Sequence, residues 1–305
     1  MTHSRNYRTL KRLIVPALAG GALAALAFAP TFGAEPVQAN SPAQSISAPK
    51  GDAPKANVPK TDIPKADVPR PDDVKTGEIN EQTPHKEANP STFTGTSVIS
   101  ESKTFEHQRF DNTTSDQNSF IGKNKASITI DSSVFDKTGN TTNDDNSNFR
   151  GQNAVVLGIE GSQTSIKDSN ITSNSIGSNA VFATGEGSVI NVENTNIHTK
   201  GDSSRGLDAT YKGTVNGKNL TITTEGAHSA TLATDRGEGT ITAEAAKLTT
   251  SGTGSPVIYS TGNIIVNNVN GIANNSEIGV VEGKNSITLT NSNVTGYKDN
   301  GFMLY

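Results

Sequence analysis

The chain has 305 residues, a formal net charge of −4 and no cysteine. Hydrophobic residues make up 32% and aromatic residues 5%, with no tryptophan, whereas ordinary globular chains are roughly 45–50% apolar. This composition excludes a large compact core, a disulfide scaffold and thiolate metal or nucleophile chemistry. The acidic balance also gives no electrostatic basis for binding nucleic acid.

Residues 1–39 have the three-part layout of a secretory signal peptide. Basic residues precede an apolar run over residues 13–29, and small residues suited to cleavage follow at residues 32–34 and 37–39. An uncleaved membrane anchor is the alternative, although the run is short for spanning a bilayer. The pattern predicts export, with the mature protein secreted or held at the cell surface, including an outer-membrane-associated location.

Residues 40–91 are predicted to form a disordered spacer rich in proline and lysine. Proline recurs at every fifth position, which prevents helix and sheet and favours extended polyproline II. These prolines are Pro49, Pro54, Pro59, Pro64 and Pro69. A segment that binds the cell envelope or another partner is the alternative to a plain spacer.

From residue 128 onward one pattern of eight residues recurs, with apolar or small residues at its ends and usually another apolar residue between them. Successive instances end 36, 26, 23, 28, 24 and 22 residues apart, and a polar insert over residues 137–150 lengthens the first interval. The instances are residues 128–135, 164–171, 190–197, 213–220, 241–248, 265–272 and 287–294. A fixed period of this length is the signature of a solenoid.

A second short apolar segment follows each instance at a steady offset. These segments are residues 154–157, 180–183, 206–209, 230–233, 256–259, 278–281 and 301–304. All segments are short, rich in Val, Ile and Thr, and separated by Gly and Asn, which favours strands over helices. We therefore predict an all-β, right-handed parallel β-helix over residues 92–305, with about seven or more coils of about 22–28 residues. Because the chain stops inside a predicted strand, we expect the solenoid to be incomplete at its C-terminus or covered there.

Asparagine immediately precedes the last apolar residue in four instances, which predicts a ladder of stacked amides. These residues are Asn170, Asn196, Asn219 and Asn293. With phrases such as SIKDSNITSNS and SITLTNSNVTG, the sequence resembles the right-handed parallel β-helix (pectin-lyase-like) superfamily. It is most similar to the repetitive adhesin or autotransporter-passenger regions of bacterial surface proteins. That superfamily includes both adhesins and polysaccharide lyases, so the resemblance alone does not choose a function.

Two groups of charged residues are candidate sites. Glutamate precedes glycine at one recurring turn, and stacked carboxylates there would either be solvated or share a calcium ion. This calcium column comprises Glu160, Glu186, Glu238 and Glu282. A β-helix lyase would need clustered carboxylates and a base, and the nearest candidates are Arg205, Asp208, Asp235 and Arg236. We expect these four to form an ordinary surface salt bridge, because the aligned face lacks a charged cleft.

No catalytic motif or cofactor motif is present, and the five histidines are scattered without metal-ligand spacing. The sequence therefore predicts a non-catalytic structural or adhesin-like surface protein whose Thr/Ser/Asn-rich faces bind a glycan or protein receptor on a host or neighbouring cell. Attachment to the cell envelope would run through the spacer or a missing C-terminal region. The alternative is a polysaccharide-degrading lyase or hydrolase on the same fold.

Overall fold

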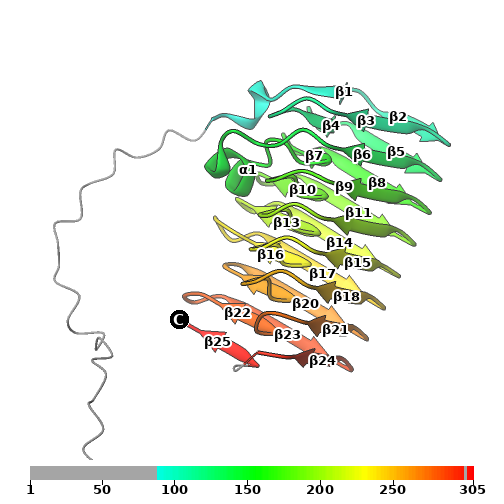
Figure 1. The fold of residues 1–305 in the computed structure, drawn as a ribbon. Helices are drawn as coiled ribbons and strands as arrows, with labels where there is room; N and C mark the ends of the chain where they lie inside the picture. The colour runs from blue at the N-terminus through cyan, green and yellow to red at the C-terminus, as the bar shows by residue number, and fades with distance from the viewer. Residues whose placement is uncertain (1–87, 299–300) are drawn as a thin grey trace, which may run out of the picture. The chain divides into compact units, whose positions relative to one another are not determined.

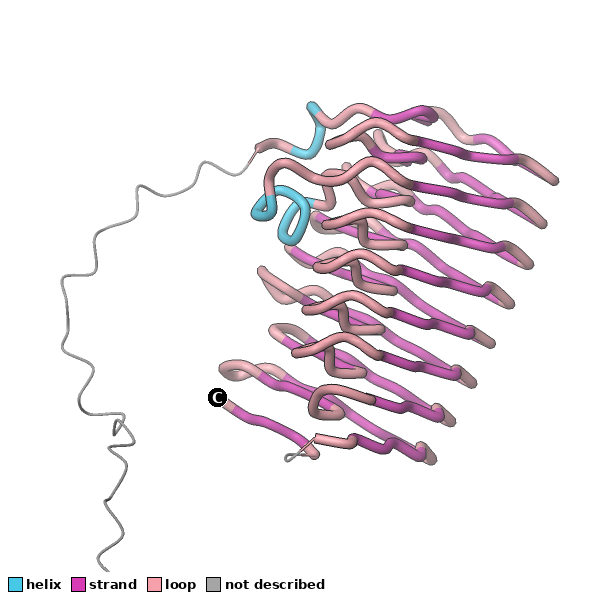
Figure 2. The backbone as a smooth tube through the Cα atoms, viewed as in Figure 1, coloured by secondary structure: helices cyan, strands magenta, loops and turns pink. Residues whose placement is uncertain are grey.

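The structure, a computed structural model, describes residues 88–298 and 301–305. Within these ranges the chain folds as a parallel β-helix, in which successive coils stack and their strands form three sheets that run along the stack (Figures 1 and 2). The prediction of an all-β solenoid is thus confirmed, with about eight coils. The predicted signal peptide, most of the predicted spacer, and both His3 and His85 lie outside the described residues.

Each coil contributes one strand to each sheet, and all neighbours within a sheet are parallel. Sheet A contains β1 (Gly95–Ile99), β4 (Asn118–Gly122), β7 (Val156–Gly158), β10 (Val181–Thr184), β13 (Leu207–Thr210), β16 (Leu232–Thr234), β19 (Ile258–Ser260), β22 (Gly279–Val281) and β25 (Phe302–Leu304). Sheet B contains β2 (Lys103–Glu106), β5 (Ser127–Asp131), β8 (Gln163–Lys167), β11 (Val189–Glu193), β14 (Thr214–Lys218), β17 (Thr240–Glu244), β20 (Asn263–Asn267) and β23 (Ser286–Thr290). Sheet C contains β3 (Arg109–Asn112), β6 (Val134–Lys137), β9 (Asn170–Ser173), β12 (Asn196–Thr199), β15 (Thr221–Thr224), β18 (Lys247–Thr250), β21 (Asn270–Ala273) and β24 (Asn293–Gly296).

Alternation of apolar and polar residues builds a narrow core. In β5, Ile128 and Ile130 are buried while Ser127 and Thr129 are exposed, as the two-residue period of a strand requires. Stacking then places such residues in columns, so that Ile130 lies beside Ile166 of the next coil. A chain with few apolar residues can fill this core because each coil needs only a handful of them.

One residue in the left-handed backbone conformation turns each coil from sheet B to sheet C. These residues are His107, Ser132, Asp168, Asn194, Asn219, Ala245, Asn268 and Asn291. The amide N–H at this position donates to a carbonyl of the following coil, as from Asn194 to Lys218 at 3.0 Å. Asn and Asp tolerate this conformation better than most residues, which explains their abundance at the bend.

The predicted asparagine ladder exists, but it occupies two columns. The Nδ2 atom of Asn196 donates to Oδ1 of Asn170 at 3.2 Å, within sheet C. The Nδ2 atom of Asn219 instead donates to Oδ1 of Asn194 at 3.1 Å, at the bend. Asn293 pairs in register with Asn270 in sheet C. Asn219 is therefore not part of the sheet C column to which its sequence position assigned it.

Two of the seven sequence instances were out of register. Ile190 pairs with Val215 and not with Gly213, so the instance over residues 213–220 was placed two residues early. The instance over residues 265–272 was placed one residue late, because Ile264 is the buried member and Ile265 is 40% exposed. A slip of one residue moves a strand's side chains to the opposite face, and hydrophobicity alone did not distinguish these adjacent isoleucines.

The first coil, formed by β1, β2 and β3, lay inside the predicted domain but was not recognised as a repeat. Its apolar residues are fewer, and phenylalanines replace the usual Ile and Val. The rings of Phe105 and Phe110 lie 5.5 Å apart edge to face, and those of Phe110 and Phe135 stack at 4.8 Å. Such pairs add to the stability gained from burial alone, so this aromatic cluster fills the N-terminal end of the core.

The polar insert after β6 contains one short helix, α1 (Asp144–Arg150). The side chain of Asn143 caps its N-terminus by accepting from the amide of Asn146, and acidic residues in the first turn complement the helix dipole. Gly151 ends the helix in the left-handed conformation, with φ of 77°, which favours glycine. A Cβ atom at this position would lie 2.6 Å from Leu157 and 2.7 Å from Phe182, so the end of α1 sits directly against sheet A.

Candidate functional site

The outer face of sheet A changes character along the stack. Its outward-facing residues in register are Ile121, Leu157, Phe182, Asp208, Ala233, Tyr259, Val280 and Met303. The first three pack with Phe93 and Ala154 into a hydrophobic cluster separate from the axial core. In the next coil, Asp208 places a carboxyl group at the position that Leu157 and Phe182 fill with buried apolar side chains.

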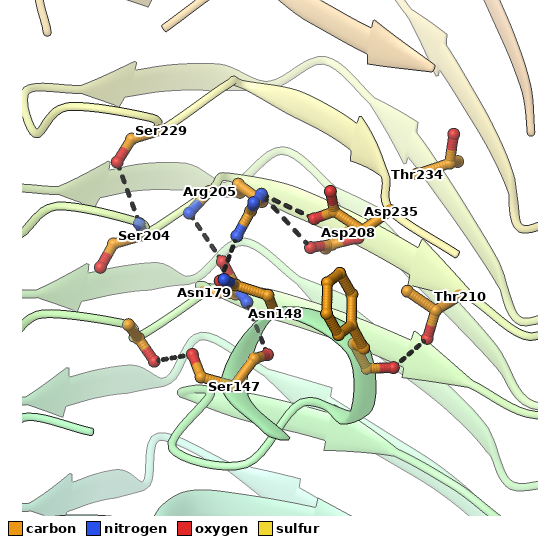
Figure 3. A network of polar contacts seen from close by, with 12 residues as sticks. Ser147, Asn148, Asn179, Ser204, Arg205, Asp208, Thr210, Ser229, Thr234 and Asp235 are labelled. Atoms are coloured by element: carbon orange, nitrogen blue, oxygen red, sulfur yellow. Dashed lines mark hydrogen bonds and ion pairs between the residues drawn. The ribbon is translucent and has the colours of Figure 1, made fainter. Parts of the chain in front are cut away.

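Helix α1 contacts the strands beside Asp208 through polar groups (Figure 3). The Oδ1 atom of Asn148 accepts a hydrogen bond from Nη1 of Arg205 at 2.7 Å. The carbonyl of Phe149 accepts from Oγ1 of Thr210 at 2.9 Å. The amide of Arg205 also donates to Oδ1 of Asn179 at 2.8 Å. The insert and the coils therefore fix the position of Arg205 from two sides.

Arg205 holds two carboxyl groups that come from neighbouring coils. Its Nε atom lies 2.8 Å from Oδ2 of Asp235 and 3.8 Å from Oδ2 of Asp208. The side chain of Asp208 is fully buried, and that of Asp235 is only 6% exposed. Neither oxygen of Asp208 accepts a hydrogen bond from the described residues, and the short contact of Asp235 is an ion pair rather than a well-directed hydrogen bond. One cation thus faces two carboxyl groups in a place where unpaired charge is costly.

A proton retained on one of the two carboxyl groups would remove the excess negative charge. Burial raises the pKa of Asp208 well above its ordinary value, and the carboxyl of Asp235 raises it further, against the opposing effect of Arg205. Burial also raises the pKa of Asp235, which the nearby guanidinium partly offsets. Asp208, which lies farther from Arg205, is the carboxyl whose pKa is raised more strongly. With a proton on Asp208, the guanidinium of Arg205 and the carboxylate of Asp235 would balance each other's charge.

A cavity of about 190 Å³ opens beside this cluster. Asp235 and Arg205 contribute polar walls, Pro256 and Tyr259 contribute apolar surface, and the exposed His228 also lines it. The hydroxyl of Tyr259 donates to Oε1 of Glu282 at 2.8 Å. Burial, followed by this hydrogen bond, raises the pKa of Tyr259, so its phenol stays protonated. Asp208 does not line the cavity.

The sequence prediction for these residues was right about the ion pair, which Arg205 forms with Asp235, but wrong about its place on the surface. Arg205, Asp208 and Asp235 were expected to form a surface salt bridge on a face without a charged cleft, but they are buried beside a cavity. Arg236, which was grouped with them, places its guanidinium 3.8 Å from the ring centroid of Phe149, and its charge also lowers the pKa of Asp235. Burial by α1 was the missing element, because a polar insert gives no repeat signal that would place it on sheet A.

A second candidate surface is a groove of about 440 Å³ on the outer face of sheet B. It is lined by Ser165, Asn191, Val192, Glu193, Asn216, Gly217, Lys218, Thr242, Ala243, Glu244, Ile265 and Asn267. A side-chain ladder runs along its floor: Asn216 donates to Oδ1 of Asn191 at 2.9 Å, and Thr242 donates to Oδ1 of Asn216 at 2.8 Å. The groove crosses five coils, from β8 to β20, and its amide and hydroxyl groups are spaced as the strands are.

The four glutamates of the predicted calcium column lie in separate local environments. Oε2 of Glu160 accepts from the amide of Asn124 at 3.2 Å. Oε2 of Glu186 lies 3.7 Å from Nζ of Lys212. Glu238 is exposed, and Glu282 accepts from Tyr259 as described above. Within residues 88–298 and 301–305, no three His, Asp or Glu side chains come together in a way that could hold a metal ion. The calcium column stays a prediction for titration to test.

Two further histidines lie away from both surfaces. His107 occupies a bend, and Nε2 of His198 pairs with Oε1 of Glu225 at 2.6 Å on the exposed face of sheet C.

In the part of the chain that the structure describes, no helix has the length and apolar character needed to cross a bilayer. Comparisons with protein-family models, with curated proteins and with solved structures found no match. Any conclusion about a ligand therefore rests on the two surfaces described above.

Proposed function

We propose that this protein is a non-catalytic, adhesin-like surface protein that binds an extended, hydroxyl-rich chain along the groove of sheet B. The observation that carries this proposal is the continuous ladder of Asn191, Asn216 and Thr242 along the groove floor. Parallel strands repeat every 4.8 Å or so, so the groove offers equivalent donors and acceptors at regular intervals. A polysaccharide, which also repeats regularly and is rich in hydroxyl groups, is the ligand class that this pattern fits.

The charge around the groove favours an uncharged ligand. In register along one edge, the residues alternate in sign through Lys167, Glu193, Lys218 and Glu244. Opposite charges on successive coils limit repulsion within the stack and leave no strong field of one sign along the edge. A polyanion such as nucleic acid needs a row of basic groups, which this edge does not supply.

We further propose that the protein is exported and displayed on a bacterial surface, in the manner of the adhesin or autotransporter-passenger regions that its repeats resemble. Residues 1–39 and the proline-lysine repeat that follows them support this proposal, since they combine an export pattern with a spacer pattern. Fractionation of a bacterial host expressing the whole chain tests it. Recovery of the unprocessed protein in the cytoplasm would contradict it.

Binding of the whole chain to an array of neutral and charged polysaccharides tests the groove. The double substitution Asn216→Ala and Thr242→Ala removes two rungs of the ladder and should weaken binding about tenfold or more, equivalent to roughly 1.4 kcal/mol. The control is Thr223→Ala with Thr249→Ala, which removes two hydroxyls in register on the outer face of sheet C. Equal loss in both double variants, or no glycan bound by the wild type, would contradict the proposal.

A polysaccharide-degrading enzyme is the second candidate, and the buried pair Asp208 and Asp235 is the observation that favours it. Glycoside hydrolysis uses two carboxyl groups, one of them often protonated. However, both carboxyls must reach the scissile bond, and only Asp235 lines the cavity. Release of reducing ends from the polysaccharides that bind, with its loss in Asp235→Asn, would support this candidate over the adhesin proposal.

A further inference from the structure

We propose that the cavity lined by Arg205, His228, Asp235 and Tyr259 is a binding site for a single neutral sugar ring. This site lies on the outer side of sheet A, whereas the proposed polysaccharide groove lies on sheet B. The inference therefore does not depend on the groove binding any ligand.

The first argument is the pairing of a donor and an acceptor at one wall. The guanidinium of Arg205 and the carboxylate of Asp235 lie 2.8 Å apart and are held on neighbouring coils. Two adjacent hydroxyl groups of a sugar ring can each donate to a carboxylate and accept from a guanidinium, so a fixed pair of this kind matches a vicinal diol. Asn148 and Asn179 hold Arg205 in place, which means that little ordering is needed when a ligand binds.

The second argument is a third polar group in the cavity wall. The exposed side chain of His228 lines the cavity together with Arg205 and Asp235. An imidazole ring can donate or accept a hydrogen bond. It therefore offers a further partner for the hydroxyl groups on the rim of a sugar ring.

The third argument concerns charge. The guanidinium of Arg205 and the carboxylate of Asp235, 2.8 Å apart, already offset each other's charge, so a charged ligand would add an uncompensated charge to a partly buried place. A second carboxylate would be repelled by Asp235, and an ammonium group would be repelled by Arg205. A neutral polyol avoids both penalties.

The fourth argument is size and surface. A volume of about 190 Å³ is below the roughly 300–1,000 Å³ of pockets for drug-sized ligands, and it suits one ring rather than a chain. Pro256 and the ring of Tyr259 give the cavity apolar surface in addition to its polar wall. A sugar ring has the complementary form, with C–H groups on its faces and hydroxyl groups around its rim.

The test is ligand-observed NMR on the whole chain, with methyl glycosides of glucose, galactose, mannose and N-acetylglucosamine as neutral probes. Glucuronate and glucosamine serve as the charged probes. We expect at least one neutral glycoside to bind with a dissociation constant in the millimolar range, and both charged sugars to bind about tenfold more weakly or not at all. Absence of binding by every neutral probe, or a preference for either charged sugar, overturns the proposal.

Substitutions then locate the bound sugar. Ala230→Leu places a larger side chain in the cavity wall and should abolish binding. His228→Ala, at an exposed position, should weaken binding and is the variant to use if Ala230→Leu does not fold. The variant Thr223→Ala on sheet C is the matched control and should bind as the wild type does. Loss of binding in the groove variant Asn216→Ala with Thr242→Ala, together with retention in His228→Ala, would place the sugar in the groove and overturn the cavity proposal.

Discussion

The Nε atom of Arg205 lies 2.8 Å from Oδ2 of Asp235, and this single ion pair joins two neighbouring coils. Through Asn148, the same guanidinium also holds the insert that carries α1. Asp208 lies within the same cluster with no hydrogen bond of its own. Arg205 therefore connects the central coils, the insert and the wall of the cavity.

Arg205→Met is expected to destabilise the protein by about 3–5 kcal/mol, the range for breaking a buried ion pair. The methionine keeps much of the packing volume but leaves the carboxylate of Asp235 without its cation. Urea unfolding followed by far-ultraviolet circular dichroism measures the change, which suits a chain without tryptophan.

The matched control is Lys167→Met, since Lys167 pairs with Asp168 at 4.0 Å with both side chains nearly half exposed. Exposed pairs of this kind contribute about 0–1 kcal/mol. If the two substitutions destabilise the chain equally, the buried cluster has no special role in its stability.

Asp208→Asn is expected to change how stability depends on pH. The folded state raises the pKa of Asp208, so above about pH 4 the folded chain binds this proton more tightly than the unfolded chain does. The stability that the carboxyl contributes is therefore complete at low pH and is lost as pH rises through its folded pKa. Thermal melts from pH 4 to neutrality should show the wild type losing stability relative to Asp208→Asn. A difference that is constant, or that grows in favour of the wild type, would show that Asp208 is not protonated in the fold.

The repeat was predictable because every coil buries apolar residues at equivalent positions. Ile128, Ile190 and Ile241 all face the axis at equivalent positions. The spacing of apolar residues therefore gives the period of the solenoid. Register was less certain where two isoleucines are adjacent, as at Ile264 and Ile265, because either one can be aligned with the column.

The cluster around Arg205 could not be predicted in the same way, since it depends on residues that break the repeat. One signal was available: Asp208 occupies the column of Phe182 and Leu157, and a carboxyl among covered apolar residues indicates a specific environment. The cap of α1 was also readable, from Asn143 before two acidic residues and Gly151 after Arg150. Which face the helix would cover was not encoded in any local pattern.

Lys137→Met tests the other buried cation of the described chain. The ammonium of Lys137 donates to the carbonyls of Thr114 and Gly139 at 2.9 and 2.8 Å. Burial lowers the pKa of Lys137 from 10.5 to about 8, against the opposing effect of Asp116. Between these two values the unfolded chain binds more protons than the folded chain, so this residue makes stability rise with pH. Unfolding free energies measured from pH 7 to 10 should rise for the wild type relative to Lys137→Met, and parallel curves would contradict the lowered pKa.

Gly151→Ala should loosen the insert from sheet A. The φ of 77° costs a non-glycine residue about 1–2 kcal/mol, and the new Cβ atom would lie 2.7 Å from the ring of Phe182, which adds an overpacking cost of about 1–3 kcal/mol. Gly161→Ala is the matched control, because φ there is 74° but the added Cβ meets only the flexible side chain of Lys125, at 3.3 Å. Urea unfolding should therefore show a larger loss for Gly151→Ala than for Gly161→Ala. Equal losses would mean that only backbone conformation matters and that α1 does not pack against Phe182 as closely as the structure shows.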